Sequence, residues 1–187
     1  MAMTNVFTGA NGTLTLADES SPEGADAKAV MDTYELRTVG RVTEVQVQVQ
    51  TQLEEFHEIG RRHATSLHPG DVHIDGTVGR AYVNGALLFL LLGRGAGATQ
   101  VPEPYVQPTF TMTLTLNDPA VPGNTASLEL KGVKFQNWAL AIPEDEFVME
   151  NLAFKALTIS VVDKEAPAGG GQAVAKAPGF PAAAAQA

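Results

Sequence analysis

Hydrophobic and polar residues alternate along residues 42–53, VTEVQVQVQTQL. Because successive side chains of a strand point to opposite faces, this period of two predicts a long strand, which we place from about residue 38 to residue 53. One face carries Val45, Val47 and Val49, continued by Thr51 and Leu53. Outer surfaces are usually rich in Lys, Glu and Arg, so an almost uncharged second face indicates a purpose beyond solubility. A half-solvated strand with a chance run of Gln is the alternative. The second face consists of Glu44, Gln46, Gln48, Gln50 and Gln52.

The same alternation predicts several further strands. Residues 71–78 place Val72, Ile74 and Val78 on an inward face, and residues 109–116 (TFTMTLTL) alternate Thr with apolar side chains. The remaining candidate strands are residues 13–16, 127–131, 134–142 and 153–162. The sum is a mainly β domain, a β-sandwich or partial barrel of roughly six to eight strands.

Residues 84–92 (NGALLFLLL) favour a helix instead. Asn84 can cap its start, Gly93 can end it, and its interior lacks the β-branched residues typical of a strand. A helix that is apolar on all sides must be covered on more than one side. We therefore expect one flanking helix, buried partly by the sheet and partly by a neighbouring subunit.

Two long segments lose the alternation. Residues 18–35 are acidic and contain Pro and Gly, which predicts an exposed loop with one helical turn near residues 27–31. Residues 54–70 predict a second long loop or an extended hairpin arm. From residue 164 to residue 187 the chain is mostly Ala, Gly and Pro, a composition that cannot bury enough apolar area to become ordered. We expect one domain over residues 1–163 and a disordered tail.

Composition narrows the classes of function. The 187 residues contain no cysteine, which excludes disulfides, thiolate metal sites and a Cys nucleophile, and fits assembly in a reducing cytoplasm. The first residues lack the features of a secretory signal, and the longest apolar run is far below the ~20 residues of a membrane helix. A net charge of −9 argues against tight DNA binding, because such surfaces rely on Lys and Arg.

Candidate chemistry is sparse. A zinc-protease helix needs two His four residues apart, whereas His63 follows His57 by six residues. A pair of His with Asp71 or Asp75 around a metal stays as the alternative to a role in a subunit contact. The glycine-rich residues 93–99 follow a helix, whereas a phosphate-binding loop precedes one. We predict no catalytic residue, no metal site and no cofactor. The four histidines in question are His57, His63, His68 and His73.

The order of these pieces resembles the tail tube proteins of long-tailed bacteriophages and, more broadly, the tube proteins of contractile injection machines. The resemblance rests on residues 7–16 (FTGANGTLTL), on the long polar-faced strand and on residues 74–88 (IDGTVGRAYVNGALL). Residues 147–156 (FVMENLAFKA) are similar to the segment that leads into the final strand of that family. The resemblance covers about residues 4–163.

The resemblance implies six-fold rings that stack into a hollow tube, in which strands of neighbouring subunits form one continuous lumenal β-barrel. It implies a structural virion protein of the tail that encloses a tape-measure protein, with or without a sheath around it. DNA would pass to the host cell without specific binding, and this chain would not insert into a membrane. Many members have a markedly acidic lumen, from which the Gln run departs.

The same resemblance assigns two sets of residues by position. The residues that would face the lumen are Glu44, Gln46, Gln48, Gln50, Gln52, Asp71, His73 and Asp75. The residues that would make contacts between rings are Asp18, Glu19, Glu23, Asp26, Asp32, Glu54, Arg61 and Arg62. Two other functions stay open: a secretion or injection tube that passes protein effectors, and a monomeric β-sandwich module with a His-containing metal or sugar site.

Overall fold

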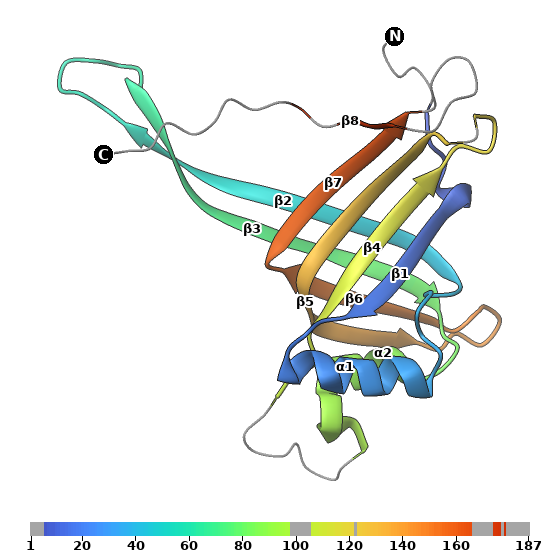
Figure 1. The fold of residues 1–187 in the computed structure, drawn as a ribbon. Coiled ribbons are helices and arrows are strands. Elements are labelled where there is room, and N and C mark those ends of the chain that lie inside the picture. Colours follow the sequence, from blue (N-terminus) through green and yellow to red (C-terminus); the bar gives the residue numbers. More distant parts are fainter. Residues whose placement is uncertain (1–5, 98–105, 122, 166–173, 177, 179–187) are drawn as a thin grey trace.

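The computed structural model describes residues 6–97, 106–121, 123–165 and 174–176, together with Pro178. Eight strands and two α-helices are found in these residues (Figure 1). The helices are α1 (Pro22–Thr33) and α2 (Ala86–Leu92), with short 3-10 turns at Gly9–Asn11 (η1) and Gly93–Gly97 (η2). The strands are β1 (Gly12–Asp18), β2 (Val42–Phe56), β3 (Ser66–Ala81), β4 (Phe110–Asn117), β5 (Thr125–Ala141), β6 (Met149–Ala156), β7 (Thr158–Glu165) and β8 (Val174–Lys176).

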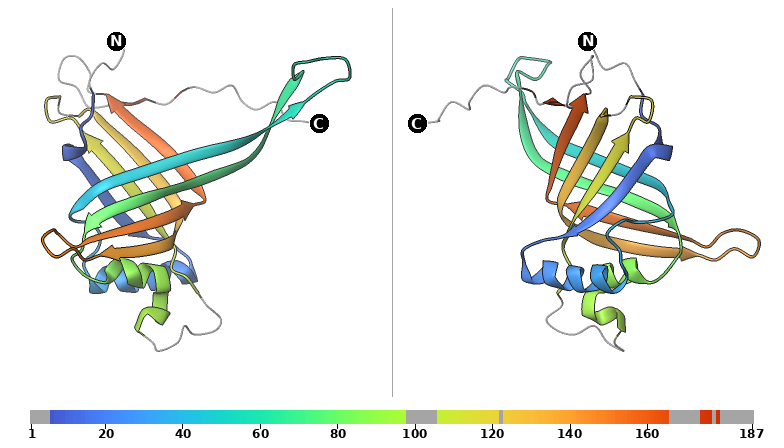
Figure 2. Two further views of the ribbon diagram at one scale, coloured as in Figure 1. Left: turned by 180° about the vertical axis from the view of Figure 1, so that it is seen from behind. Right: turned by 45° about the vertical axis from the view of Figure 1, so that its right-hand side comes forward.

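All strand pairs are antiparallel and follow the order β1-β4-β5-β6-β3-β2, with β7 pairing to β5 and β8. Strand β5 belongs to both halves of the sheet. Its first half pairs with β4 and β7, and its second half pairs with β6. Register shifts in β5 and in its partner β4 bend the sheet at this point, as bulges do. The sheet therefore curls into a half-barrel, which confirms the predicted mainly β partial barrel (Figure 2).

The core lies inside this curl. Phe110, Met112, Leu130 and Val133 have no exposed surface, and Phe154 is almost as buried. Neighbouring strands pack closely against the backbone at Gly76. A Cβ atom there would lie 2.1 Å from the Gln46 carbonyl oxygen and 2.6 Å from the Phe154 ring. Only glycine fits there. These contacts fix strands β2, β3 and β6 against one another.

Helix α1 corrects the prediction for residues 18–35, which expected a loop with a single helical turn. The Ser21 side chain caps the helix by accepting a hydrogen bond of 2.9 Å from the Gly24 amide, and Pro22 occupies the first position, where its missing N–H costs nothing. Ala27 and Met31 pack into the core. The acidic segment is thus a structural helix.

Helix α2 confirms the predicted helix in residues 84–92. Its buried side is made by Ala86, Leu87 and Leu90, whereas Leu88 and Phe89 are only half-buried. The sheet and α1 therefore cover part of an apolar helix and leave another part open.

Several boundaries differ from the predicted ones, among them those of β2 and β3, which extend into the segment 54–70 that was predicted as a loop or hairpin arm. The two strands predicted at 127–131 and 134–142 are one strand, β5, and the single strand predicted at 153–162 is divided between β6 and β7 at Leu157. Strand β8 places three residues of the predicted disordered tail in the sheet, and most of residues 164–187 lie outside the described residues. No helix in the described part of the chain is long and apolar enough to cross a membrane.

Candidate assembly surfaces: the polar face and the arm

The polar residues predicted to share one face do so. In the β2/β3 hairpin, Gln48 lies opposite Asp75 and Gln50 lies opposite His73, so the amides of one strand and the polar side chains of the next form one continuous surface. The pairing is irregular between Thr51 and Leu53, which places Gln52 and Asp71 in the interrupted stretch. Apart from a half-buried Asp75, the face predicted to line a lumen is exposed. Its residues are Glu44, Gln46, Gln48, Gln50, Gln52, Asp71, His73 and Asp75.

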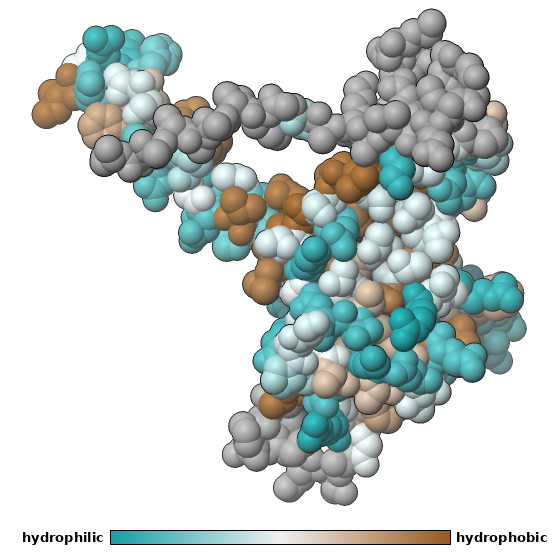
Figure 3. Space-filling view, in the orientation of Figure 1, coloured by the Kyte–Doolittle hydropathy of each residue, from teal (hydrophilic) through white to brown (hydrophobic). Residues whose placement is uncertain are grey.

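The opposite face of the same hairpin is apolar, and the core covers only its base. Ile74 is 7% exposed, but Val72, two residues away on the same face, is 58% exposed. Val49 and Leu53 are 51% and 60% exposed. Residues 49–73, which we call the arm, extend far beyond the rest of the sheet (Figures 1 and 2). Hydrophobic side chains recur along the arm in the space-filling view (Figure 3).

Several strand edges of the sheet carry no further strand in the described residues, and two of them bound the curved layer β5-β6-β3-β2. Strand β2 pairs with β3 alone, over its whole length. Strand β5 pairs on both sides, with β4 and β7, only as far as Lys131, and its second half from Lys134 pairs with β6 alone. The Gln107 side chain donates to the Phe135 carbonyl oxygen, so the uncovered edge begins beyond that residue. Edges of this kind are templates for pairing with another chain.

Comparison with known proteins finds solved structures with a similar fold. No protein-family model and no curated protein matches the sequence. Among solved structures, a chain of the anti-feeding prophage cap (the tube-terminating cap) is similar with a TM-score of 0.58 at 11% identity, covering 86% of this chain and 93% of that one. A chain of the extended sheath–tube complex of an extracellular contractile injection system has a TM-score of 0.57 at 10% identity, covering 86% of this chain and 93% of that one. The SPP1 tail tube has a TM-score of 0.52 at 9% identity, covering 83% of this chain and 78% of that one. The chain has the tail-tube fold.

In this tail-tube fold, the five acidic residues of segment 18–35 that were predicted to contact another ring have partners within the chain. The Glu19 carboxylate accepts from the Thr111 hydroxyl at 3.0 Å and from the Gly132 amide at 2.7 Å. Asp26 accepts from the Arg94 guanidinium at 2.8 Å. An inter-ring role for these residues stays a prediction. The other pairs are Asp18 with Lys28 at 3.8 Å, Glu23 with Lys134 at 2.6 Å and Asp32 with Arg37 at 3.3 Å.

Glu23 joins α1 to the sheet. Its carboxylate lies 2.6 Å from the Lys134 ammonium and accepts a hydrogen bond of 2.8 Å from the Thr109 hydroxyl. The hydrogen bond from Lys134 and then that from Thr109 lower the pKa of Glu23, because both stabilise the ionised carboxylate. At this end the Thr-rich face that leads into β4 is therefore covered by carboxylates, Glu23 at Thr109 and Glu19 at Thr111.

The arm holds the remaining predicted inter-ring residues, Glu54, Arg61 and Arg62, all of them exposed. Arg61 lies 3.6 Å from Glu58, a pair that is exposed and contributes little to stability. His57 lies 3.1 Å from Glu55. In the part of the chain that the structure describes, no three His, Asp or Glu side chains gather as a metal site would require.

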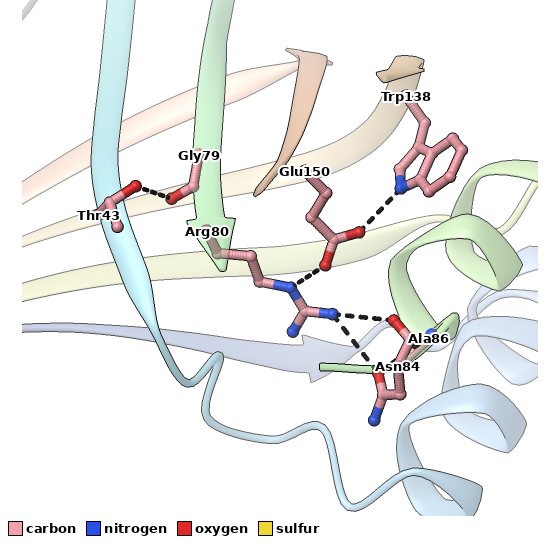
Figure 4. Close-up of polar contacts among 7 residues, drawn as sticks. All are labelled: Thr43, Gly79, Arg80, Asn84, Ala86, Trp138 and Glu150. Atoms are coloured by element: carbon pink, nitrogen blue, oxygen red, sulfur yellow. Dashed lines mark hydrogen bonds and ion pairs between the residues drawn. The ribbon is translucent and has the colours of Figure 1, made fainter. Parts of the chain in front are cut away.

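The sequence did not predict a buried ionic cluster beside α2 (Figure 4). Arg80 of β3 and Glu150 of β6 form an ion pair, and Glu150 also accepts a hydrogen bond of 2.8 Å from the Trp138 indole. Arg80 donates to the Asn84 carbonyl oxygen at 3.3 Å, and the Asn84 side chain accepts from the Ala86 amide at 3.2 Å. The cluster thus ties two strands of the sheet to the start of α2. One signal was present: Arg80 continues the inward series of Ile74 and Val78.

Proposed function

We propose that this chain is a structural subunit that assembles into hexameric rings, and that the rings stack into the hollow tail tube of a virion, through which DNA reaches the host cell. The observation that carries this proposal is the arm, which at residues 49–53 and 71–73 is polar on one face and apolar on the other. A monomer in water leaves the apolar face exposed without compensation. Contiguous exposed apolar surface of this kind is typical of a protein interface.

The free edges supply the geometry for a ring. The edge of β2 in one copy and the edge of the second half of β5 in the next are the two sides of the same curved layer, β5-β6-β3-β2. Pairing them around a closed ring satisfies the backbone groups of both edges and produces one continuous barrel. The polar face of β2 and β3 then lines the lumen.

A lumen lined by Gln side chains suits the passage of DNA. Each cation that contacts a DNA phosphate adds affinity and slows release, and this face offers no Lys or Arg among its eight predicted residues. Primary amides keep the wall hydrated without holding a polyanion. During assembly the lumen would enclose a tape-measure protein. The outer wall would contact a sheath if the tail is contractile, as in the sheath–tube complex that has this fold.

The test is the size and shape of the purified protein. Light scattering should give the mass of six copies of the 19.7 kDa chain, and negative-stain microscopy should show six-fold rings or tubes with a central channel. A monomer at every concentration, with no rings in the images, would refute the proposal. Zinc binding by such a monomer through His57, His63 or His68 would support the binding-module alternative.

A second candidate function is a tube that passes protein effectors. It is favoured by the TM-score of the chain from the extracellular contractile injection system, which exceeds that of the SPP1 tail tube. Material recovered from inside tubes isolated from the native source distinguishes the two, because a virion tail is joined to a DNA-filled capsid and an injection device carries protein.

A further inference from the structure

Helices α1 and α2 border a groove of about 490 Å³ on the surface of the subunit. The Tyr34 and Phe89 rings lie side by side in it, with centroids 5.8 Å apart. The groove contains the part of α2 that the chain itself leaves open, since Phe89 is only half-buried. Its rim carries Arg94, which is 78% exposed and paired with Asp26. The walls are formed by Ala29, Val30, Thr33, Tyr34, Phe89 and Gly93.

A second feature of the chain is an exposed turn, which we call the knob. The turn between β5 and β6, residues 142–148, carries Phe147 at 84% exposure and Ile142 at 73% exposure. Between them lie three consecutive acidic residues, Glu144, Asp145 and Glu146. Most of this phenylalanine side chain is left unpacked by the described part of the chain, and aromatic residues are enriched where protein interfaces form.

The two features lie near the same level of the subunit. The β5–β6 turn projects sideways from the body just above the level of the helices, and the C-terminal half of α1, which lines the groove, is the half nearer the turn (Figure 2). Because a knob and a groove are different surfaces, their contact is heterologous, and it closes into a ring when the rotation between copies allows it.

We propose that Phe147 of one copy inserts into the α1–α2 groove of the next copy in the same ring. The inference rests on the proposed function, which supplies the neighbouring copy. The aromatic ring joins Tyr34 and Phe89, and the acidic residues before it face the exposed Arg94 guanidinium at the rim. The contact also covers the open side of α2, whose apolar character exceeds what one subunit can bury.

The absence of cysteine from the sequence allows a direct test by cross-linking. The double variant Ala29→Cys/Phe147→Cys places one thiol on an exposed wall position of the groove and one at the knob. Oxidation of its rings should give a ladder of disulfide-linked chains up to the hexamer on a denaturing gel. The control Ala29→Cys/Leu157→Cys uses a residue that is 79% exposed but lies elsewhere, and it should give no ladder. Rings of the Phe147 pair without a ladder would overturn the inference.

A second measurement does not depend on disulfide geometry. Phe147→Ser should raise the concentration needed for half-assembly at least about tenfold, because burying a phenylalanine at each contact is worth more than one factor of ten. Its unfolding midpoint as a monomer should stay unchanged. Leu157→Ser is the matched control and should assemble as the unmodified chain does.

The outcomes separate the two proposals. Normal rings from Phe147→Ser, together with no cross-link in the double variant, would overturn the knob-in-groove contact and leave the tube proposal standing. Failure of the unmodified chain to form rings at any concentration would refute both.

Discussion

Arg80 and Glu150 lie opposite each other on neighbouring strands and form an ion pair in which both side chains are withdrawn from water, at 2% and 0% exposure. Each partner is also hydrogen-bonded elsewhere, Glu150 to the Trp138 indole and Arg80 to Asn84. Such a pair gains little over apolar residues of the same size, but removal of one partner leaves a buried charge uncompensated. The pair therefore fixes how β3, β6 and the start of α2 meet.

We expect Glu150→Leu to lower the free energy of unfolding by about 3–5 kcal/mol, because Arg80 would then be buried without a counter-charge. The double variant Arg80→Met/Glu150→Leu should recover a large part of this loss, since neither charge remains. Urea denaturation of the monomer measures both. A loss below about 1 kcal/mol in the single variant would show that water reaches Arg80, contrary to its burial.

Local patterns predicted some of these features and missed others for physical reasons. The strict alternation of Val45 and Val47 with Gln46 and Gln48 has only one structural solution, a two-faced strand, and the register then brings Gln48 beside Asp75. Helix α1 was missed because its acidic, Gly-containing sequence has little amphipathic pattern, although Ser21 followed by Pro22 is a typical helix start. Glu150 could not be paired with Arg80, because seventy residues separate them and no local pattern spans that distance.

Stability should depend on pH through Glu23. Its pKa is lowered from the ordinary value of 4.5, so the folded state holds the ionised carboxylate more favourably than the unfolded chain does. The stabilisation is complete above pH 4.5 and is lost as the pH falls through the lower folded-state pKa. Glu23→Gln should therefore be less stable than the unmodified chain at pH 7, and the difference should shrink below pH 4.5.

Because the Glu23 side chain is 42% exposed, water and salt screen the pair, and we expect an effect well below that of Glu150→Leu. The measurement is urea denaturation of both proteins across the acidic range, at low salt. A stability difference that grows as the pH falls would contradict the proposed cause. Lys134→Met provides a matched control, because it breaks the same ion pair by removing its other member.

The charge of the polar face should control how strongly assembled tubes retain DNA. Gln48→Lys adds one cation per subunit to the wall that we propose lines the lumen, and each ring would carry six of them. The variant should keep the stability of the monomer within about 0.5 kcal/mol, because Gln48 is exposed. Its tubes should retain DNA at low salt and release it as salt rises.

Gln48→Glu is the control for this experiment, with the same position and the opposite charge, and its tubes should retain no more DNA than unmodified tubes. Retention is measured by sedimenting tubes with a short labelled duplex over a series of salt concentrations. Equal retention by all three proteins would place Gln48 outside the lumen.

Val72 and Ile74 offer the sharpest comparison of folding with assembly, because they lie two residues apart on the same face of β3 and differ in exposure, 58% against 7%. Ile74→Ser removes a core side chain and should cost about 2–4 kcal/mol of monomer stability. Val72→Ser should cost less than about 0.5 kcal/mol in the monomer, since more than half of this side chain lies in water. If the arm is covered by another copy, Val72→Ser should instead weaken assembly, which light scattering over a concentration series measures. Normal assembly by Val72→Ser would mean that the apolar face of the arm stays in water even in the ring, and the energetic argument for the tube would then lose its basis.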